Sequence, residues 1–379
     1  MCVCIRGHKT PCVVWAVFEM TVTLHRVELR RVKRKACVRC SSSGGDGVSS
    51  SAKAQERYGK VGIGTWSWGN KFLWNYNEDK DAVIEEALHE AVRGGVRLVD
   101  TADSYGTGAL EGRAEMLLGK ALRSCSNKEA SANVCVATKL APYPWRITRT
   151  SVVDAARKSL ARLGDARERI DCAQLHWSTA NYAPWQERAL WDGIADACEA
   201  GLVDSVGLSN YGPKQLRRAV TYLRDERGVK VALAQAQIGL LSREPLKPGN
   251  LKDVCDDLGV VLLGYSPLAL GLLSGKYDEH GAKLPSGPRA LLFRRLLPKI
   301  APLLVALRDV ASRTGQSVAQ VAIAYVSTKG IIPIVGCNTV EQAKQNVAIT
   351  DLDDDDIRIL DAAADTSTGA MVQNIFNTS

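Results

Sequence analysis

The sequence predicts a (β/α)8 barrel that begins near residue 56 and occupies the rest of the 379-residue chain. Eight short apolar runs carry this prediction, because each is continuous rather than alternating, as strands buried on both faces are. Longer segments with helical periodicity separate the runs, and no shift in composition divides the series. A doubly wound open sheet is the alternative, but no GxGxxG motif follows the first run, where a dinucleotide fold needs it.

The predicted strands lie in the apolar runs 61–66, 97–101, 134–140, 170–177, 205–210, 232–238, 260–266 and 331–336. The segments between them have the pattern of amphipathic helices. In 79–95 (DKDAVIEEALHEAVRGG), for example, the alanines and aliphatic residues share one helical face. Gly94 and Gly95 then supply a helix stop. The eight strand–helix units together predict one domain over residues 56–379.

The first 55 residues differ in composition from the rest, and we expect them to be a plastid transit peptide with a flexible linker. Nine Lys and Arg but only three Asp and Glu lie in residues 1–50, so six of the eight net positive charges are there. An Arg-rich, acid-poor segment that ends in SSSGGDGVSSS (41–51) is typical of a targeting leader. A mitochondrial or secretory signal, or a leader without targeting function, is the alternative.

Charge and cysteine spacing argue against several kinds of partner. Of the net charge of +8, residues 1–50 hold +6, so the rest of the chain carries +2 and no basic patch for nucleic acid is expected. The apolar run 12–18 is too short to span a bilayer. The six later cysteines show no CxxC pair or other zinc-binding spacing, so we expect neither a metal site nor a disulfide framework.

Ionisable residues stand where the second, third and fourth runs stop: Asp100, Lys139 and His176, with Tyr105 just beyond the first. Taken alone, Asp100 could be a helix cap, Lys139 a solvent-facing side chain and His176 a core histidine. Together they lie at the C-terminal strand ends, where a barrel of this kind has its active site. We expect Asp100 to keep Lys139 charged, and Lys139 to lower the pKa of the Tyr105 phenol toward neutral pH. Tyr105 would then be a general acid for a carbonyl oxygen, and neutral His176 a second donor, which predicts carbonyl reduction. For Asp103, on the following loop, a turn or cap role is expected.

Five motifs, in the same order along the chain, resemble those of the aldo-keto reductases. They are DTADSYG at 100–106, ATK at 137–139, QLHW at 174–177, GLSNYG at 207–212 and YSPL at 265–268. The resemblance runs from about residue 61 to the C-terminus and implies a barrel with the four residues above as its catalytic set. Longer stretches are similar to plastid members of the family that reduce pyridoxal to pyridoxine; among them are GTWSWGN (64–70), QLHWSTANYAP (174–184) and LPSGPRALLFRRLLP (284–298).

The resemblance also implies a nicotinamide cofactor, with NADPH expected and NADH the alternative. The residues implied to bind it are Ser209, Asn210, Gln235, Tyr265, Ser266, Leu268, Gly336, Asn338, Gln342 and Asn346. Thr339 and Gln342 fit a capping box, and a helix N-terminus is an anion site. Asn338 stands where many members have Lys or Arg for the 2′-phosphate of NADP, and Lys344 is expected to supply that charge.

Aromatic residues follow several strand ends and predict an apolar mouth that suits a flat aldehyde such as pyridoxal. The residues expected to line it are Trp66, Trp68, Trp145 and Trp177. Two alternatives stay open. One is a broad-specificity plastid reductase of reactive aldehydes, and the other is a cofactor-sensing regulatory subunit similar to the potassium-channel β-subunits. The oligomeric state is not predicted.

Overall fold

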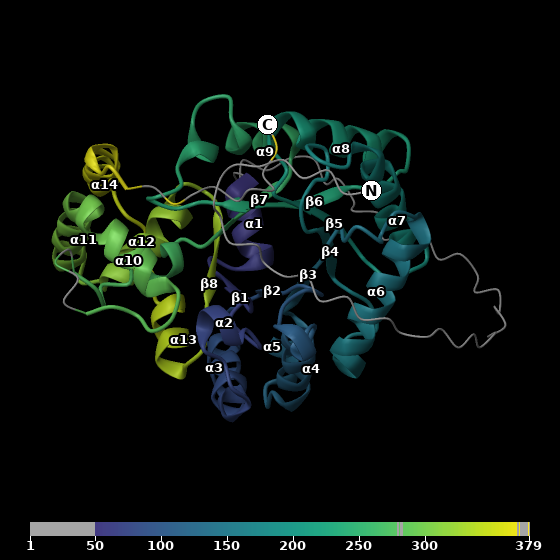
Figure 1. Ribbon diagram of the computed structural model, residues 1–379, viewed down its shortest axis with the longest axis horizontal. Helices are drawn as coiled ribbons and strands as arrows, with labels where there is room; N and C mark the ends of the chain where they lie inside the picture. Colours follow the sequence, from purple (N-terminus) through teal and green to yellow (C-terminus); the bar gives the residue numbers. More distant parts are fainter. Residues whose placement is uncertain (1–49, 279, 281–282, 370, 372–377, 379) are drawn as a thin grey trace, which may run out of the picture. The chain divides into compact units, whose positions relative to one another are not determined.

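A closed barrel of eight parallel strands forms the centre of the computed structural model (Figure 1). The structure describes residues 50–278, 280, 283–369, 371 and 378, so the predicted leader up to residue 49 lies outside the described residues. The strands are β1 Gly62–Gly64, β2 Leu98–Asp100, β3 Cys135–Leu140, β4 Cys172–Leu175, β5 Val206–Ser209, β6 Val231–Gln237, β7 Val261–Tyr265 and β8 Ile332–Gly336. One strand overlaps each predicted apolar run, so the predicted barrel is confirmed and the open sheet is wrong.

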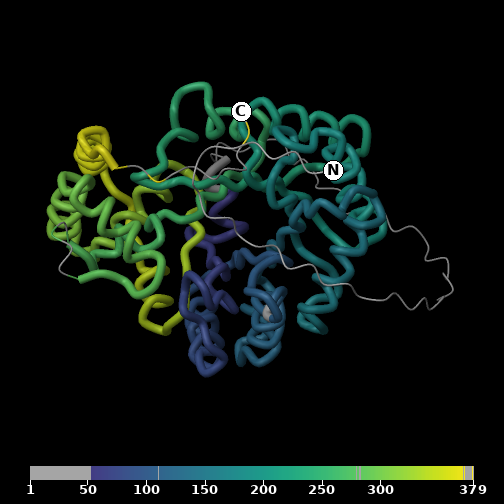
Figure 2. The backbone as a smooth tube through the Cα atoms, in the orientation of Figure 1, coloured from purple at the N-terminus to yellow at the C-terminus, as the bar shows by residue number. Residues whose placement is uncertain are grey.

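The last strand closes the ring by pairing with the first. In this parallel pair Ile334 of β8 lies opposite Gly62 of β1, and Gly336 lies opposite Gly64; Figure 2 shows the yellow-green end of the barrel beside the purple start. Helices surround the strands, except for the first helix, which lies at one end of the barrel. They are α1 Ser50–Tyr58, α2 Lys71–Trp74, α3 Asp81–Arg93, α4 Arg113–Ser124, α5 Lys128–Ala132, α6 Arg149–Leu163, α7 Pro184–Glu199, α8 Pro213–Asp225, α9 Leu251–Leu258, α10 Arg289–Leu296, α11 Ala301–Thr314, α12 Val318–Thr328, α13 Val340–Val347 and α14 Asp354–Thr366.

Alternation along the strands divides the barrel interior into an apolar layer and a polar layer. The apolar layer is a buried cluster near the N-terminal ends that includes Leu98, Ala137, Cys172, Leu233 and Leu263. Successive side chains of a strand point to opposite faces, so the residue two positions further along returns to the interior. Those next interior residues are Asp100, Lys139, Gln174, Gln235 and Tyr265. The strand pattern itself therefore places ionisable and amide groups together at the C-terminal end of the barrel.

Helix α1 closes the N-terminal end of the barrel. Its Ala54 and Tyr58 side chains are buried and belong to the same apolar cluster as Leu98 and Leu233. Figure 1 shows the purple helix within the ring of strands. The predicted boundary between residues 55 and 56 falls inside this helix, so a leader-free protein for experiments should begin no later than Ser50.

An ion pair with a buried glutamate connects the outer face of β3 to two helices. Glu115 of α4 is fully buried, accepts a hydrogen bond from Thr138 Oγ1, and pairs with Arg162 of α6 at 2.6 Å between Oε2 and Nε. Because Thr138 points outward to this pair, its neighbour Lys139 points into the barrel. The contacts outside the barrel thus fix the direction of a side chain inside it.

The described part of the chain has no helix that is long and apolar enough to cross a membrane. Within the same residues, no three His, Cys, Asp or Glu side chains are grouped so that they could hold a metal ion. None of the six cysteines between Cys125 and Cys337 forms a disulfide.

Candidate active site

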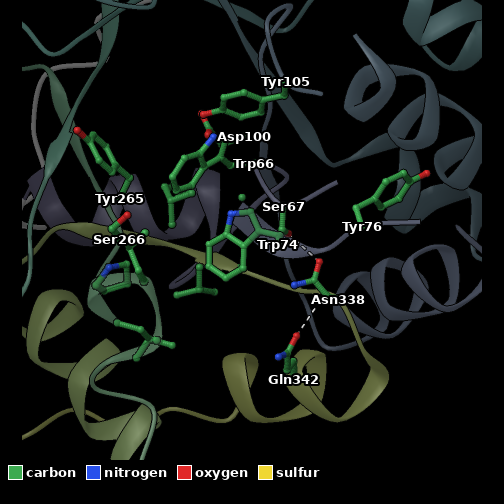
Figure 3. A pocket seen from close by; sticks show the side chains of 18 of the residues that line it. Trp66, Ser67, Trp74, Tyr76, Asp100, Tyr105, Tyr265, Ser266, Asn338 and Gln342 are labelled. Atoms are coloured by element: carbon green, nitrogen blue, oxygen red, sulfur yellow. Dashed lines mark hydrogen bonds between the residues drawn. The ribbon is translucent and has the colours of Figure 1, made fainter. Parts of the chain in front are cut away.

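One large cavity opens at the C-terminal ends of the strands, as the position of the polar layer requires. Its volume is about 1040 Å³. The lining includes all four predicted catalytic residues, Asp100, Tyr105, Lys139 and His176. Figure 3 shows Tyr105 and Asp100 at one end of the cavity, Asn338 and Gln342 at the other, and Trp74 between them. The cavity is therefore elongated, with the predicted chemistry at one end.

Lys139 connects the carboxylate of Asp100 to the phenol of Tyr105. Its Nζ donates to Asp100 Oδ2 at 2.5 Å, to the Thr101 carbonyl at 3.0 Å and to Tyr105 Oη at 3.1 Å. An ammonium has three donors and no acceptor, so these three contacts use all of its protons. Lys139 must be the donor to Tyr105. The hydroxyl proton of Tyr105 consequently remains available to a group in the cavity.

Asp100 is held on both of its oxygens. While Oδ2 accepts from Lys139, Oδ1 accepts from Gln174 Nε2 at 3.2 Å and from Gln235 Nε2 at 2.8 Å. The side chains of Asp100 and Lys139 are 3% and 1% exposed, so water does not screen the pair. Charge-assisted bonds from three donors keep this buried carboxylate in one position.

The expected acidification of Tyr105 is wrong for the protein without bound cofactor or substrate. Burial raises the pKa of the Tyr105 phenol well above its ordinary value, and the negative charge of Asp100 raises it further. Burial also lowers the pKa of Lys139, although Asp100 opposes that shift. Because Asp100 neutralises the ammonium, the ion pair presents little net charge to the phenol. Tyr105 therefore stays protonated, which is the form that a proton donor requires.

His176 is held as a neutral ring beside Tyr105. Burial lowers its pKa well below the ordinary value, and the positive charges of Lys139 and Arg146 lower it further. The ring meets Tyr105 edge to face, with centroids 5.8 Å apart at an angle of 71°. The main-chain nitrogen of His176 donates to the Leu140 carbonyl at 3.1 Å, and its carbonyl accepts from Asn210 Nδ2 at 3.0 Å. The expected neutral donor is thus present next to the phenol.

Most of the predicted cofactor residues line the same cavity. These are Ser209, Asn210, Gln235, Tyr265, Ser266, Leu268, Gly336, Asn338 and Gln342. Several have a second task that the sequence did not reveal. The Asn210 side chain joins three strand ends, since Nδ2 also donates to Ser209 Oγ at 3.1 Å and Oδ1 accepts from the Tyr265 hydroxyl at 2.9 Å.

Asn346, which the resemblance implies to bind the cofactor, does not line the cavity. It is buried, and its Nδ2 donates to the Gly336 carbonyl at 3.2 Å from beneath the end of β8. Lys344 also stays outside the lining, on the exposed side of α13. At this end of the cavity, Asn338 instead accepts a hydrogen bond from Ser67 Oγ at 2.7 Å, and its backbone N–H donates to Gln342 Oε1 at 2.8 Å. Figure 3 shows this chain of contacts.

Several residues between 266 and 277, which follow β7, together with Arg289 at the start of α10, form a wall of the cavity that sequence reasoning largely missed. Ser266, Ala269 and Leu270 have positive φ angles of 56°, 48° and 60°. Residues other than glycine rarely adopt this left-handed backbone conformation. Such backbone strain is concentrated at functional sites. Lys276 and Arg289 from this wall line the cavity as well. The stretch 284–298 that resembles family members contains Arg289, but nothing in the sequence indicated that the side chain of either cation faces the cavity.

Arg289 lies over the ring of Trp74, with its guanidinium carbon 4.4 Å from the ring centroid. Arg289 Nε and Trp74 Nε1 are both buried and have no hydrogen-bond partner among the described residues. Buried donors of this kind are rare unless a ligand or water satisfies them. The two donors are therefore available to an acceptor of a ligand or of water in this part of the cavity.

The four predicted tryptophans divide into two groups. Trp66 and Trp177 line the cavity, as expected. Trp68 does not line the cavity as expected, because it is completely buried and donates from Nε1 to the Cys337 carbonyl at 3.0 Å. Trp145 does not line the cavity either. It is 65% exposed, and its ring stacks on that of Tyr143 with the centroids 4.7 Å apart. Positions in the sequence could not separate these four, because spacing does not fix the direction of a side chain on a loop.

Asp103 has a structural role other than the expected turn or cap. Its carboxylate is buried, pairs with Arg146 at 2.5 Å and accepts from the Ala141 backbone N–H at 3.1 Å. Burial raises its pKa to about 6, although Arg146 opposes the shift. Asp103 thus connects the Tyr105 loop to the loop after β3.

Comparisons with known proteins agree with this geometry. The model of the aldo/keto reductase family matches residues 60–365, most of the chain. The chain belongs to the aldo/keto reductase family. It is similar to the chloroplastic pyridoxal reductase of Arabidopsis thaliana, with 46% identity over 323 residues that cover 84% of this chain and 86% of that protein. The family membership makes the chain an oxidoreductase and confirms the predicted class of reaction.

Two more distant relatives show how widely the fold is used. The NADH-specific methylglyoxal reductase of Escherichia coli is 26% identical over 313 residues, which cover 76% of this chain and 89% of that protein. The solved structure of an aldo-keto reductase from Klebsiella pneumoniae in complex with NADPH has a TM-score of 0.61 and 22% identity, and the match covers 84% of this chain and 98% of that one. The second likeness supports the fold alone.

Proposed function

We propose that this aldo-keto reductase reduces pyridoxal to pyridoxine with NADPH in the chloroplast. The observation that carries the proposal is the Tyr105 hydroxyl, held by Lys139 at 3.1 Å with its proton free for the cavity and with neutral His176 at its side. The choice of pyridoxal rests on the similarity to the Arabidopsis enzyme. Trp66 and Trp177 in the lining supply flat apolar surfaces that suit an aromatic aldehyde.

The residues of the cavity fit a nicotinamide dinucleotide. Ser209, Asn210 and Gln235 present amide and hydroxyl groups that suit a carboxamide, and Tyr265 presents an aromatic ring. The orphaned donors of Arg289 and Trp74 lie farther along, where phosphate or adenine acceptors would satisfy them. When bound, the reduced nicotinamide supplies a hydride to the carbonyl carbon.

The chain's own residues supply the proton and hold the developing charge. The aldehyde oxygen would accept hydrogen bonds from the Tyr105 hydroxyl and from a ring N–H of His176. As negative charge grows on that oxygen, Tyr105 transfers its proton, and the bond from Lys139 Nζ strengthens because the phenol becomes a phenolate. Asp100, whose carboxylate accepts hydrogen bonds from three donors, keeps Lys139 in place throughout. The products are the alcohol and the oxidised cofactor.

The preference for NADPH over NADH rests on cations in the lining. Lys80, Lys276 and Arg289 all line the cavity. The positive charge available to a phosphate there therefore does not depend on Lys344. A guanidinium bonds a phosphate in a planar, charge-assisted geometry. Arg289→Leu should therefore raise the KM for NADPH about ten- to a hundredfold, and the KM for NADH much less. Arg294→Leu, on the exposed side of the same helix, is the matched control; equal losses for both cofactors would contradict the preference.

A substrate and cofactor panel tests the proposal as a whole. The protein from Ser50 onward is assayed with pyridoxal and with small aliphatic aldehydes, each with NADPH and with NADH. The proposal expects the highest kcat/KM for pyridoxal with NADPH. Higher values for small aldehydes would favour a broad aldehyde reductase. Cofactor binding without turnover of any aldehyde would favour a cofactor-sensing regulatory subunit.

Localisation needs its own experiment, because residues 1–49 lie outside the described part of the chain. The Arabidopsis relative is named as chloroplastic, and the leader composition agrees with import into a plastid. A fusion of residues 1–55 to a fluorescent protein should enter chloroplasts. Entry into mitochondria, or retention in the cytosol, would contradict this part of the proposal.

A further inference from the structure

Ser104, the residue before Tyr105, lies against the ring of His176. Its Oγ is 3.4 Å from His176 Nδ1, and its side chain also lines the cavity. Among the described residues, no other group forms a hydrogen bond with either ring nitrogen of His176. Within the described part of the chain, Ser104 is thus the one protein group whose hydrogen bond can select which ring nitrogen carries the proton.

The position of that proton matters because the ring is neutral. Lys139 and Arg146 both oppose a positive charge on the ring, so His176 carries a single N–H, on either Nδ1 or Nε2. Only the nitrogen that carries the proton can donate to an aldehyde oxygen. The hydrogen bond made by one ring nitrogen decides which tautomer is present.

The Ser104 hydroxyl favours one of the two tautomers. If Ser104 Oγ donates to Nδ1, that nitrogen is the acceptor and the ring proton lies on Nε2. Ser104 Oγ has no other hydrogen-bond acceptor among the described residues, so donation to Nδ1 is its best use. The reverse arrangement would place the ring proton on Nδ1 and leave the hydroxyl proton without a protein partner.

We propose that Ser104 is a positioning residue that holds His176 in the Nε2–H tautomer and so keeps its donor available to the substrate carbonyl. This inference rests on the proposed role of His176 as a carbonyl donor. It gives adjacent residues of one loop complementary tasks, since Tyr105 provides the proton and Ser104 orients the proton of the neighbouring donor. The main chain and packing of His176 are fixed by other contacts, namely the bonds to Leu140 and Asn210 and the edge of Tyr105.

The test compares Ser104→Val with Ser104→Thr, which have the same shape and differ only in the hydroxyl. Nitrogen-15 NMR of the ring nitrogens reports the tautomer, and a His176→Asn variant identifies the signals of this residue among the five histidines. The wild type and Ser104→Thr should show the Nε2–H form. Ser104→Val should show a mixture, and its kcat should fall about tenfold with little change in the KM for either substrate, because one neutral hydrogen bond is lost.

Three results would overturn the inference. The first is an Nδ1–H tautomer in the wild type, and the second is an unchanged tautomer and kcat in Ser104→Val. The third is a raised aldehyde KM with an unchanged tautomer, which would assign Ser104 to direct substrate binding. The NMR measurement needs no turnover, so it stays informative even if pyridoxal is not the substrate.

Discussion

Removal of either charge from the Asp100–Lys139 pair should destabilise the fold, and removal of both should cost less than the sum. The two groups are 2.5 Å apart and almost completely buried. Lys139→Met leaves a buried carboxylate with Gln174 and Gln235 on Oδ1 and no donor on Oδ2. Asp100→Asn leaves a buried ammonium whose remaining partners are neutral oxygens.

The size of each loss follows from the burial of the pair. Removing one partner from a buried ion pair costs about 3–5 kcal/mol, because the other charge stays out of water without compensation. The double variant buries no net charge, and replacing such pairs by neutral groups of similar volume is often close to neutral in stability. We therefore expect each single variant to lose about 3–5 kcal/mol, and the double variant to lose no more than either.

Urea unfolding of the four proteins, followed by circular dichroism at neutral pH without cofactor, measures these free energies. The double-mutant cycle then gives the coupling between the two residues. Losses that add to within about 0.5 kcal/mol would refute the reasoning, since they would mean that the two charges do not compensate each other. All three variants should lose reductase activity, because Tyr105 loses either its donor or the anchor of that donor.

Two further predictions concern residues outside the catalytic set. Because the pKa of Asp103 is raised to about 6 from 3.8, its contribution is present below the lower value and is lost as pH rises through the upper one. Wild-type stability relative to Asp103→Asn should therefore fall by about 2 kcal/mol between pH 4 and pH 6.5 in urea unfolding, and a difference that rises with pH would contradict the buried carboxyl. Trp68→Phe should lower the free energy of unfolding by about 1–3 kcal/mol, because the Cys337 carbonyl loses its hydrogen-bond donor, and should leave the KM for pyridoxal unchanged. Trp145→Ala should change the free energy of unfolding by under about 0.5 kcal/mol and should also leave this KM unchanged. A raised KM in either tryptophan variant would place its side chain at the substrate mouth.

The barrel and the catalytic residues on its strand ends could be predicted from the sequence, because both follow from strand periodicity. Asp100 and Lys139 lie two residues beyond the apolar positions Leu98 and Ala137, so alternation alone places them inside the barrel. His176 is the first residue after β4 and needs no loop geometry to reach the cavity. Residues set by a regular element could thus be predicted correctly.

Residues on loops could be predicted only in part, because a loop has no periodicity that fixes side-chain direction. Trp66 and Trp68 are two residues apart, yet one lines the cavity and the other is buried behind it. Arg289 and Lys276 reach the cavity through a wall with left-handed residues at Ala269 and Leu270, which no propensity scale would predict. Tertiary folding decides these positions.

Electrostatic expectations failed where two neighbours had to be weighed against each other. Sequence reasoning placed Lys139 beside Tyr105 and inferred a lowered phenol pKa from that cation alone. In the structure Asp100 neutralises the cation, and burial determines the direction of the shift. The sign of such a shift depends on distances and exposure, which a sequence does not contain.

The role of Tyr105 as proton donor is the centre of the account, and one comparison tests it most directly. Pyridoxal-dependent oxidation of NADPH is measured for the wild type and for Tyr105→Phe, and cofactor affinity is measured alongside by fluorescence titration. A positioned general acid contributes about 10²–10⁴ in rate, so kcat for Tyr105→Phe should fall at least about a hundredfold while NADPH binds as before. A Tyr105→Phe enzyme that retains most of its kcat would contradict the account.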